Sequence, residues 1–217
     1  NRKKHVFDLI WKERADLIAL QEVSSSQLDQ FKAEFSDAYY VHAHKPYTPD
    51  STILFKRDLF EMLERGYWFL DKKMSARARR IAVWVKLKHI KSQRELMFVS
   101  VHIDANVWKI EQTKRLVKKL KPMMRSKAPL FVAGDFNSDA DSDEYSVMMS
   151  YSWKDSYIGN MKNQIATYPY KNPKRRIDHV FYFGKGVRPT SWKTLKGNVD
   201  ISDHKPVLVN FQIEAAK

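Results

Sequence analysis

The chain has 217 residues, of which 39 are Lys or Arg and 25 are Asp or Glu, so its formal net charge is +14. Hydrophobic residues make up 43% and aromatic residues 13%, which is enough for a sizeable core and excludes a disordered chain. Cysteine is absent, and this excludes a disulfide scaffold, a thiolate metal cluster and a cysteine nucleophile. Because no apolar run reaches the roughly 18 residues of a membrane span, we expect no stable membrane insertion.

Helix and strand patterns alternate along the chain. Apolar residues at helical spacing predict helices over 6–14, 24–35 and 110–124, and Ser142 is a candidate cap for a short fourth helix. Short apolar runs predict strands at 17–20, 53–55, 67–70, 81–85, 96–101, 130–133, 177–183 and 207–213. This order predicts an α/β or α+β class with sheet layers flanked by helices. No repeat or linker divides the chain, so we expect one domain over residues 1–217.

Polar side chains stand at the boundaries of these strands. Three strands run into such residues and two are preceded by them; in chain order they are Glu22, His102, Asp135 with Asn137, Asp178, and Asp203 with His204. If the second group of strands runs antiparallel to the first, all of these side chains converge on one edge of a sheet. Carboxylates gathered there repel one another unless a cation lies among them. Oxygen donors without cysteine suit Mg²⁺ or Mn²⁺, and with two histidines and a basic surround they favour phosphoester cleavage.

Each of these residues also has a simpler interpretation. A Glu after an apolar run more often ends a strand or caps a helix, and an Asp-His pair before a strand is usual turn chemistry. The segment 134–137 also fits an ordinary Asx turn. The joint pattern is much less expected by chance, because the coincidence recurs at five strand boundaries.

The charge by itself predicts a class of partner. A surface of +14 attracts nucleic acid, an anionic membrane or a soluble phosphoester, although Lys can also serve only to solvate the surface. Three basic clusters lie far apart in the sequence: Arg77-Arg79-Arg80, Lys118-Lys119-Lys121 and Lys171-Lys174-Arg175-Arg176. Arg175 and Arg176 come directly before Asp178, so they are the basic residues best placed to contact a substrate phosphate.

These motifs resemble the endonuclease/exonuclease/phosphatase superfamily, the metal-dependent phosphoesterases with a DNase I-like fold, and in particular a bacterial branch of it. The matching segments are Leu20-Gln21-Glu22-Val23, Ser100-Val101-His102, Ala133-Gly134-Asp135-Phe136-Asn137, Ile177-Asp178-His179-Val180 and Ser202-Asp203-His204-Lys205-Pro206. The resemblance extends from near residue 6 to the C-terminus. It implies a four-layer α/β/β/α sandwich of two mixed sheets, with the site at one edge.

The resemblance also implies roles for single residues. Glu22 would be a direct ligand of a Mg²⁺ or Mn²⁺ ion, and Asp203 would bind or position that ion. Asp135 and Asn137 would hold and activate the attacking water. These roles together would make the chain a metal-dependent hydrolase.

Three further residues complete the implied site. His204 would contact a phosphate oxygen, with Asp178 fixing the tautomer of its imidazole. His102 would be a second phosphate contact or an acid near the leaving oxygen. His179 is left out, because side chains alternate along a strand and it points to the face opposite Asp178.

One departure concerns the start of the chain. In the family, an Asn lies on a first strand upstream of the helix that precedes Leu-Gln-Glu. Asn1 lies only a few residues before the predicted helix, with no apolar strand around it, and it receives no role. We therefore expect an N-terminally incomplete domain without its first strand, which leaves a sheet edge open.

The sequence thus predicts a monomeric, divalent-metal-dependent hydrolase of phosphoester bonds. Nucleic acid is the favoured substrate class because of the net charge of +14. Phospholipids and inositol phosphates are alternative substrates. A non-catalytic module that binds polyanions and a plain basic RNA-binding domain are alternatives of another class. A cytoplasmic and a secreted location both stay open.

Overall fold

The computed structural model describes residues 2–44, 50–71, 80–126, 128–196 and 201–214. A six-stranded sheet has the order β4 (Phe60–Phe69), β5 (Ile81–His89), β6 (Glu95–His102), β7 (Leu130–Asp135), β9 (Asp178–Phe183) and β8 (Lys154–Asp155). A three-stranded sheet has the order β1 (Leu17–Leu20), β3 (Thr52–Lys56) and β2 (Tyr39–Ala43), and β10 (Val187–Thr194) pairs with β11 (Val207–Ile213). The helices are α1 (Arg2–Glu13), α2 (Ser25–Phe35), α3 (Lys109–Leu120) and α4 (Asp143–Met149), with a 3₁₀ turn, η1, at Met123–Ser126.

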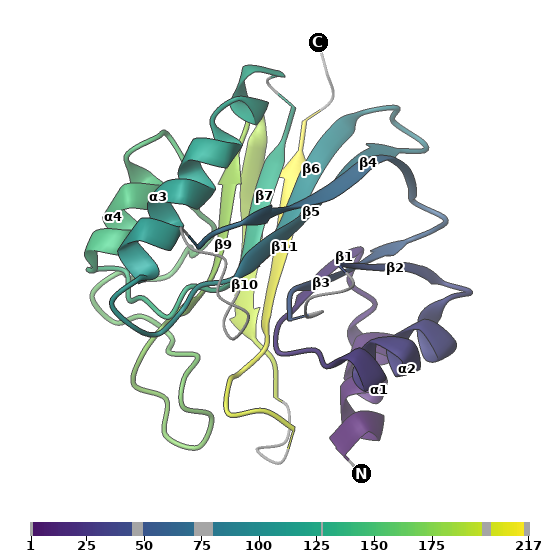
Figure 1. The fold of residues 1–217 in the computed structure, drawn as a ribbon, viewed down its shortest axis with the longest axis horizontal. Coiled ribbons are helices and arrows are strands. Elements are labelled where there is room, and N and C mark those ends of the chain that lie inside the picture. Colours follow the sequence, from purple (N-terminus) through teal and green to yellow (C-terminus); the bar gives the residue numbers. More distant parts are fainter. Residues whose placement is uncertain (1, 45–49, 72–79, 127, 197–200, 215–217) are drawn as a thin grey trace.

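Three apolar clusters separate four layers (Figure 1). One cluster, which includes Ile53 and Val85, lies between the six-stranded sheet and the two smaller sheets. A second, with Leu120 and Met148, joins α3 and α4 to the other face of the six-stranded sheet. The third packs α1 and α2 on the three-stranded sheet around Leu28. The predicted α/β/β/α sandwich is therefore confirmed.

The helices begin and end where the local chemistry requires it. The Ser24 hydroxyl accepts the N–H of Gln27, whose side chain accepts the Ser24 N–H, so α2 starts with a complete capping box. The hydroxyl of Ser142 caps α4 in the expected position. The helix predicted to reach residue 124 ends at Leu120 instead, with Lys121 as its cap, because Pro122 has no N–H to continue the helical hydrogen bonds.

Three strands were not predicted, and β4 is longer than expected. The missed strands are β2, β8 and β10. β10 contains Pro189 beside a bulge, which is tolerated because the strand lies at a sheet edge. The first half of β4 carries the exposed charges Glu61, Glu64 and Arg65, so its apolar alternation is weak.

The strand directions bring the predicted site residues to one edge. β6 runs parallel to β7, and β9 runs antiparallel to β7. The register pairs His102 with Asp135 and Asp135 with Asp178. Gly134 is needed just before this row, since a Cβ there would lie 1.8 Å from the carbonyl oxygen of Val101. The register thus brings His102, Asp135 and Asp178 together, as expected if β9 runs antiparallel to β6 and β7.

β1 and β11 each leave one edge open. Both strands pack apolar side chains on the six-stranded sheet, with β1 over β6 and β7 and β11 over β9. In the part of the chain that the structure describes, β1 pairs only with β3, and β11 pairs only with β10. The absence of a first strand stays a prediction, and these are the edges where such a strand would pair.

None of the helices in the described ranges is both long and apolar enough to cross a bilayer.

Candidate active site

The site lies where β6 and β7 end, β9 begins and the loop before β11 folds over them. Asp135, Asp178 and His204 each place a carboxylate oxygen or ring nitrogen within 4.8 Å of the others. Asp135 is buried, whereas the side chains of Asp178 and His204 are 18% and 25% exposed. The cluster is thus buried on the side of Asp135 and open to a ligand on the side of Asp178 and His204.

Asp178 and His204 form a hydrogen-bonded pair. Oδ2 of Asp178 lies 2.9 Å from Nδ1 of His204. Burial by itself would lower the pKa of His204, but the hydrogen bond and charge of Asp178, with the charges of Asp135 and Asp203, raise that pKa to about 9. The ring carries a positive charge at neutral pH, and its Nε2 lies 3.9 Å from Oδ2 of Asp135.

Asp135 is held by an Asx turn with Asn137. Oδ1 of Asp135 accepts the backbone N–H of Asn137 at 2.7 Å, and Oδ2 accepts the Asn137 amide at 3.2 Å. That amide also donates to the carbonyl of Ile103 at 2.9 Å. Both amide hydrogens of Asn137 therefore point inward, and its Oδ1 has no partner among the described residues. Burial, and then the charge of Asp178, raise the pKa of Asp135 to about 6.

His102 lies on the other side of Asp135. Its Nε2 is 3.5 Å from Oδ2 of Asp135, and its Nδ1 is 2.7 Å from a guanidinium nitrogen of Arg80 and 3.2 Å from the Asp50 carboxylate. Arg80 and Asp50 are themselves 3.0 Å apart. Because His102 is only 4% exposed, it contacts Asp135 rather than solvent.

Asp50 and the role of Arg80 were not predicted from the sequence. Asp50 lies two residues before the start of β3, as Asp203 lies shortly before β11, so the same signal of a carboxylate before a strand was present. Arg80 belongs to one of the basic clusters in the sequence, but it received no predicted role at the site. Arg77 and Arg79 of that cluster lie outside the described residues.

Glu22 and Asp203 lie outside the compact cluster. Glu22 follows β1 with a left-handed φ of 59°, its side chain is exposed, and its N–H donates to Oδ1 of Asp50 at 3.2 Å. Asp203 is also exposed and is close enough to His204 to raise the pKa of that imidazole. Two more carboxylates thus stand at the open side of the site.

One loop fixes both halves of the Asp178–His204 pair. The Thr167 hydroxyl accepts the backbone N–H groups of Ile177 and Asp178, at 3.2 and 3.3 Å. The Thr167 carbonyl accepts the N–H of Lys205 at 2.8 Å. The ring of Tyr168 lies 4.8 Å from the imidazole of His204. The loop therefore ties the start of β9 to the segment before β11.

The two arginines before Asp178 have different environments. The Arg175 side chain is 44% exposed, and its Nε lies 2.8 Å from the Asp139 carboxylate. Arg176 is buried, with a guanidinium nitrogen 2.6 Å from Oδ2 of Asp155 and another 3.0 Å from Nδ1 of His179. This corrects the expectation that Arg176 contacts a substrate phosphate, because its guanidinium faces the interior.

The chain belongs to the endonuclease/exonuclease/phosphatase family. The model of the Endonuclease/Exonuclease/phosphatase family matches residues 1–204. Members of this family are phosphoesterases, and they generally use a divalent metal. Among curated proteins, none matches the sequence.

Solved structures of the same fold include two bacterial proteins and one human protein. An endonuclease/exonuclease/phosphatase from Bacteroides vulgatus is 22% identical, with a TM-score of 0.84 over 98% of this chain and 90% of that chain. A mannosyl-6-phosphatase from Bacteroides thetaiotaomicron is 22% identical, with a TM-score of 0.83 over 98% and 91%. The catalytic domain of human Nocturnin, with a bound sulfate anion, is 20% identical, with a TM-score of 0.83 over 98% and 86%. At these identities the likeness concerns the fold.

The donor chemistry of the site fits a hard divalent cation. Five carboxylates gather at this end of the sheets: Glu22, Asp50, Asp135, Asp178 and Asp203. After burial, the charge of Asp178 is the main cause that raises the pKa of Asp135, so these two neighbouring carboxylates repel each other. Oxygen ligands without thiolates are those that Mg²⁺ and Mn²⁺ prefer.

Proposed function

We propose that this chain is a Mg²⁺- or Mn²⁺-dependent hydrolase of phosphodiester bonds, with nucleic acid as its substrate class. One observation carries the proposal: the buried carboxylate of Asp135 lies between two histidines, with Nε2 of His102 at 3.5 Å and Nε2 of His204 at 3.9 Å. A base for water and a donor for a phosphate oxygen thus stand side by side.

The ion would be held by the exposed carboxylates of Glu22 and Asp203. Asp178 is engaged by His204, and Asp135 by Asn137. Glu22 and Asp203 are therefore the carboxylates that stay open to a ligand. When bound, a divalent cation offsets the negative charge of the reacting phosphate.

The side chains of the site then have distinct tasks. Asp135 takes a proton from the attacking water, and Oδ1 of Asn137 accepts the second hydrogen of that water and orients it. The water oxygen bonds to phosphorus while the ester bond to the leaving oxygen breaks, and that oxygen takes a proton from solvent. Nε2 of His204 donates to a non-bridging phosphate oxygen. His102 positions Asp135 instead of contacting the leaving group.

The charge of the chain supports a polyanionic substrate. A net charge of +14 raises the local concentration of nucleic acid and speeds its association. Arg175 is exposed enough to contact a substrate phosphate, although it also pairs with Asp139. A phosphomonoesterase acting on a phosphosugar or inositol phosphate uses the same chemistry, so such substrates belong in the test.

The test is phosphate or nucleotide release with Mg²⁺ and with chelator. The panel holds single-stranded DNA, plasmid DNA, RNA, a chromogenic phosphodiester, mannose 6-phosphate, an inositol polyphosphate and sphingomyelin. We expect Mg²⁺-dependent turnover of nucleic acid, reduced at least ~10²-fold in Asp135→Ala and His204→Ala.

Matched controls are Asp141→Ala and His5→Ala, which alter exposed residues outside the site and should retain full activity. Circular dichroism reports whether each variant is folded. Turnover confined to monoesters would overturn the substrate class. Full activity in Asp135→Ala would overturn its role as base. Polyanion binding without turnover, unaffected by chelator, would point to a binding module.

A further inference from the structure

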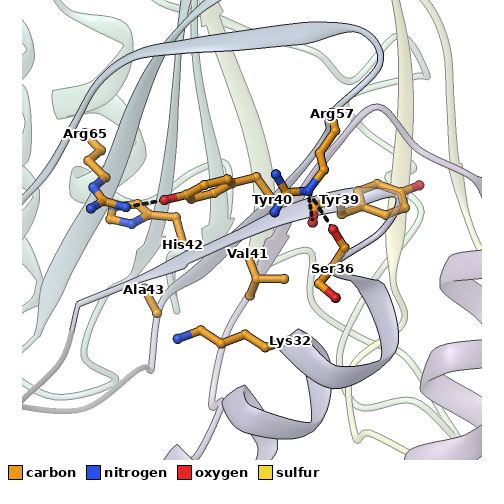
Figure 2. Close-up of a pocket in the computed structure, with 9 residues that line it drawn as sticks. All are labelled: Lys32, Ser36, Tyr39, Tyr40, Val41, His42, Ala43, Arg57 and Arg65. Atoms are coloured by element: carbon orange, nitrogen blue, oxygen red, sulfur yellow. Dashed lines mark hydrogen bonds between the residues drawn. The ribbon is translucent and has the colours of Figure 1, made fainter.

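A cavity of about 320 Å³ opens at the outer edge of the three-stranded sheet (Figure 2). None of the residues placed in the active site lines it. Its walls come from Lys32 of α2, from Val41 and His42 of β2, from Arg57 just after β3 and from Arg65 of β4. Its volume lies within the range of pockets that take small ligands.

The cavity is strongly cationic. Lys32, Arg57 and Arg65 line it, and no Asp or Glu does. None of these three cations forms a salt bridge with a carboxylate among the described residues. Like charges around one hollow repel each other, so an anion bound there is stabilised by all three.

The two arginines are held in place around one aromatic ring. Figure 2 shows Tyr40 between them, with the guanidinium of Arg57 at 5.2 Å and that of Arg65 at 5.9 Å from the ring centroid. Nε of Arg57 donates to the carbonyls of Ser36 and Tyr39, at 2.6 and 3.2 Å. Arg65 donates to the Tyr40 hydroxyl. This anchoring lowers the entropy that the side chains lose on binding a ligand.

Backbone donors face the same hollow. β2 is the edge strand of its sheet, and the N–H of Arg57 donates to the carbonyl of Ala38 at 3.0 Å. Antiparallel pairs alternate in their bonding, so the backbone groups of Val41 and Ala43 point to the open edge. Both residues line the cavity.

His42 contributes a neutral imidazole to the wall of the cavity. Its Nε2 is buried and has no hydrogen-bond partner in the described part of the chain. Burial, and then the charge of Arg65, outweigh a backbone hydrogen bond with Gly66 and lower the pKa of His42 to about 4, so the ring is neutral. An anion bound in the cavity therefore lies close to this ring and changes its surroundings.

We propose that this cavity binds a phosphate group, supplied by a phosphodiester of a nucleic acid strand that also reaches the active site. Guanidinium and ammonium groups with backbone N–H donors are the groups that recognise phosphate. Ala43 pairs with Thr52, which is two residues from Asp50, so the cavity approaches the segment that contacts His102. The choice of nucleic acid rests on the proposed function, whereas the phosphate site rests on the cavity itself.

The experiment measures binding of a fluorescent single-stranded oligonucleotide in chelator, where no turnover occurs. Lys32→Ala with Arg65→Ala is compared with Lys91→Ala with Arg125→Ala, an exposed pair outside the cavity with the same loss of charge. We expect the cavity pair to weaken binding about 10-fold or more, and the control pair by less than about 3-fold. The plot of log affinity against log salt should become shallower only in the cavity pair, by roughly 0.7 for each phosphate that the variant no longer neutralises.

A second arm uses inorganic phosphate with NMR of the His42 imidazole. Saturable shifts at His42 in the wild-type protein, absent from the Lys32→Ala, Arg65→Ala variant, support the site. Equal losses of oligonucleotide binding in both variant pairs, or no shift at His42, overturn it. If inorganic phosphate shifts the His42 signals but the protein binds the oligonucleotide no better than free phosphate, the result overturns only the claim that a nucleic acid supplies the phosphate. Neither arm needs turnover. The binding and NMR results can therefore be interpreted even if the proposed hydrolase activity is not found.

Discussion

Asp178 and His204 lie 26 positions apart in the chain, yet Oδ2 of the one and Nδ1 of the other are 2.9 Å apart. Thr167 makes this possible, since its hydroxyl accepts the N–H of Asp178 and its carbonyl accepts the N–H of Lys205. The pair fixes which ring nitrogen faces Asp135, and that choice is needed for His204 to donate to a phosphate.

Replacing Asp178 by Asn should lower kcat about 10- to 100-fold while changing KM less than about 2-fold. The amide keeps the size of the side chain but removes the charge that orients and supports the imidazole. Steady-state kinetics on a chromogenic phosphodiester provides both values. Asp178→Glu should recover part of the activity, whereas a purely structural role would show as an equal loss of thermal stability in both variants.

Glu22→Gln should raise the Mg²⁺ concentration for half-maximal activity about 10-fold or more, because a neutral amide binds Mg²⁺ less well than a carboxylate. A Mg²⁺ titration of the initial rate measures this. Glu111→Gln, an exposed change on α3, is the control and should leave the titration unchanged. If Glu22→Gln titrates like the wild type, Glu22 is not a ligand.

The buried group of Asp155, Arg176 and His179 should make the fold sensitive to acid. Burial alone would raise the pKa of Asp155, but the hydrogen bonds and charges of His179 and Arg176 outweigh it and hold that pKa well below its usual range. A carboxyl with a depressed pKa stabilises the fold above its unfolded pKa of about 3.9 and loses this contribution as pH falls towards its folded pKa. The free energy of unfolding should therefore fall steeply below pH ~4.

Urea unfolding at a series of pH values tests this dependence. Arg176→Ala, which leaves Asp155 buried without its cation, should lower the free energy of unfolding by about 3 kcal/mol or more at pH 7. Arg175→Ala, at an exposed site, should lower it far less. Parallel pH profiles for the wild type and Asp155→Asn would contradict the assignment of the acid sensitivity to Asp155.

Hydrogen exchange should alternate along β1. The N–H of Lys56 donates to the carbonyl of Asp16, so the alternating ladder directs Ile18 and Leu20 to β3 and leaves Leu17 and Ala19 at the open edge. Amides 18 and 20 should exchange at least ~10-fold more slowly than amides 17 and 19. Equal protection of all four amides, measured by NMR, would mean that another strand pairs with this edge.

Much of the fold follows from local patterns. The helical spacing of Leu28, Phe31 and Phe35 places α2 correctly because one apolar face must be buried, and Ser24 marks its start through its own hydrogen bonds. Apolar runs such as 96–101 locate the buried strands. β10 was not predicted, because a strand at a sheet edge needs little apolar character and Pro189 suggests the end of a strand.

The sequence by itself determined the residue types of the site, their places at strand boundaries and membership of a family of phosphoesterases. Only the tertiary structure decided which side chains meet. It placed Arg175 at the surface and Arg176 in the interior, although they are neighbours in sequence, because adjacent side chains of an extended chain face opposite sides. It also brought Asp50 and Arg80 to His102. Such contacts depend on strand order and loop paths, which no local pattern of residues encodes.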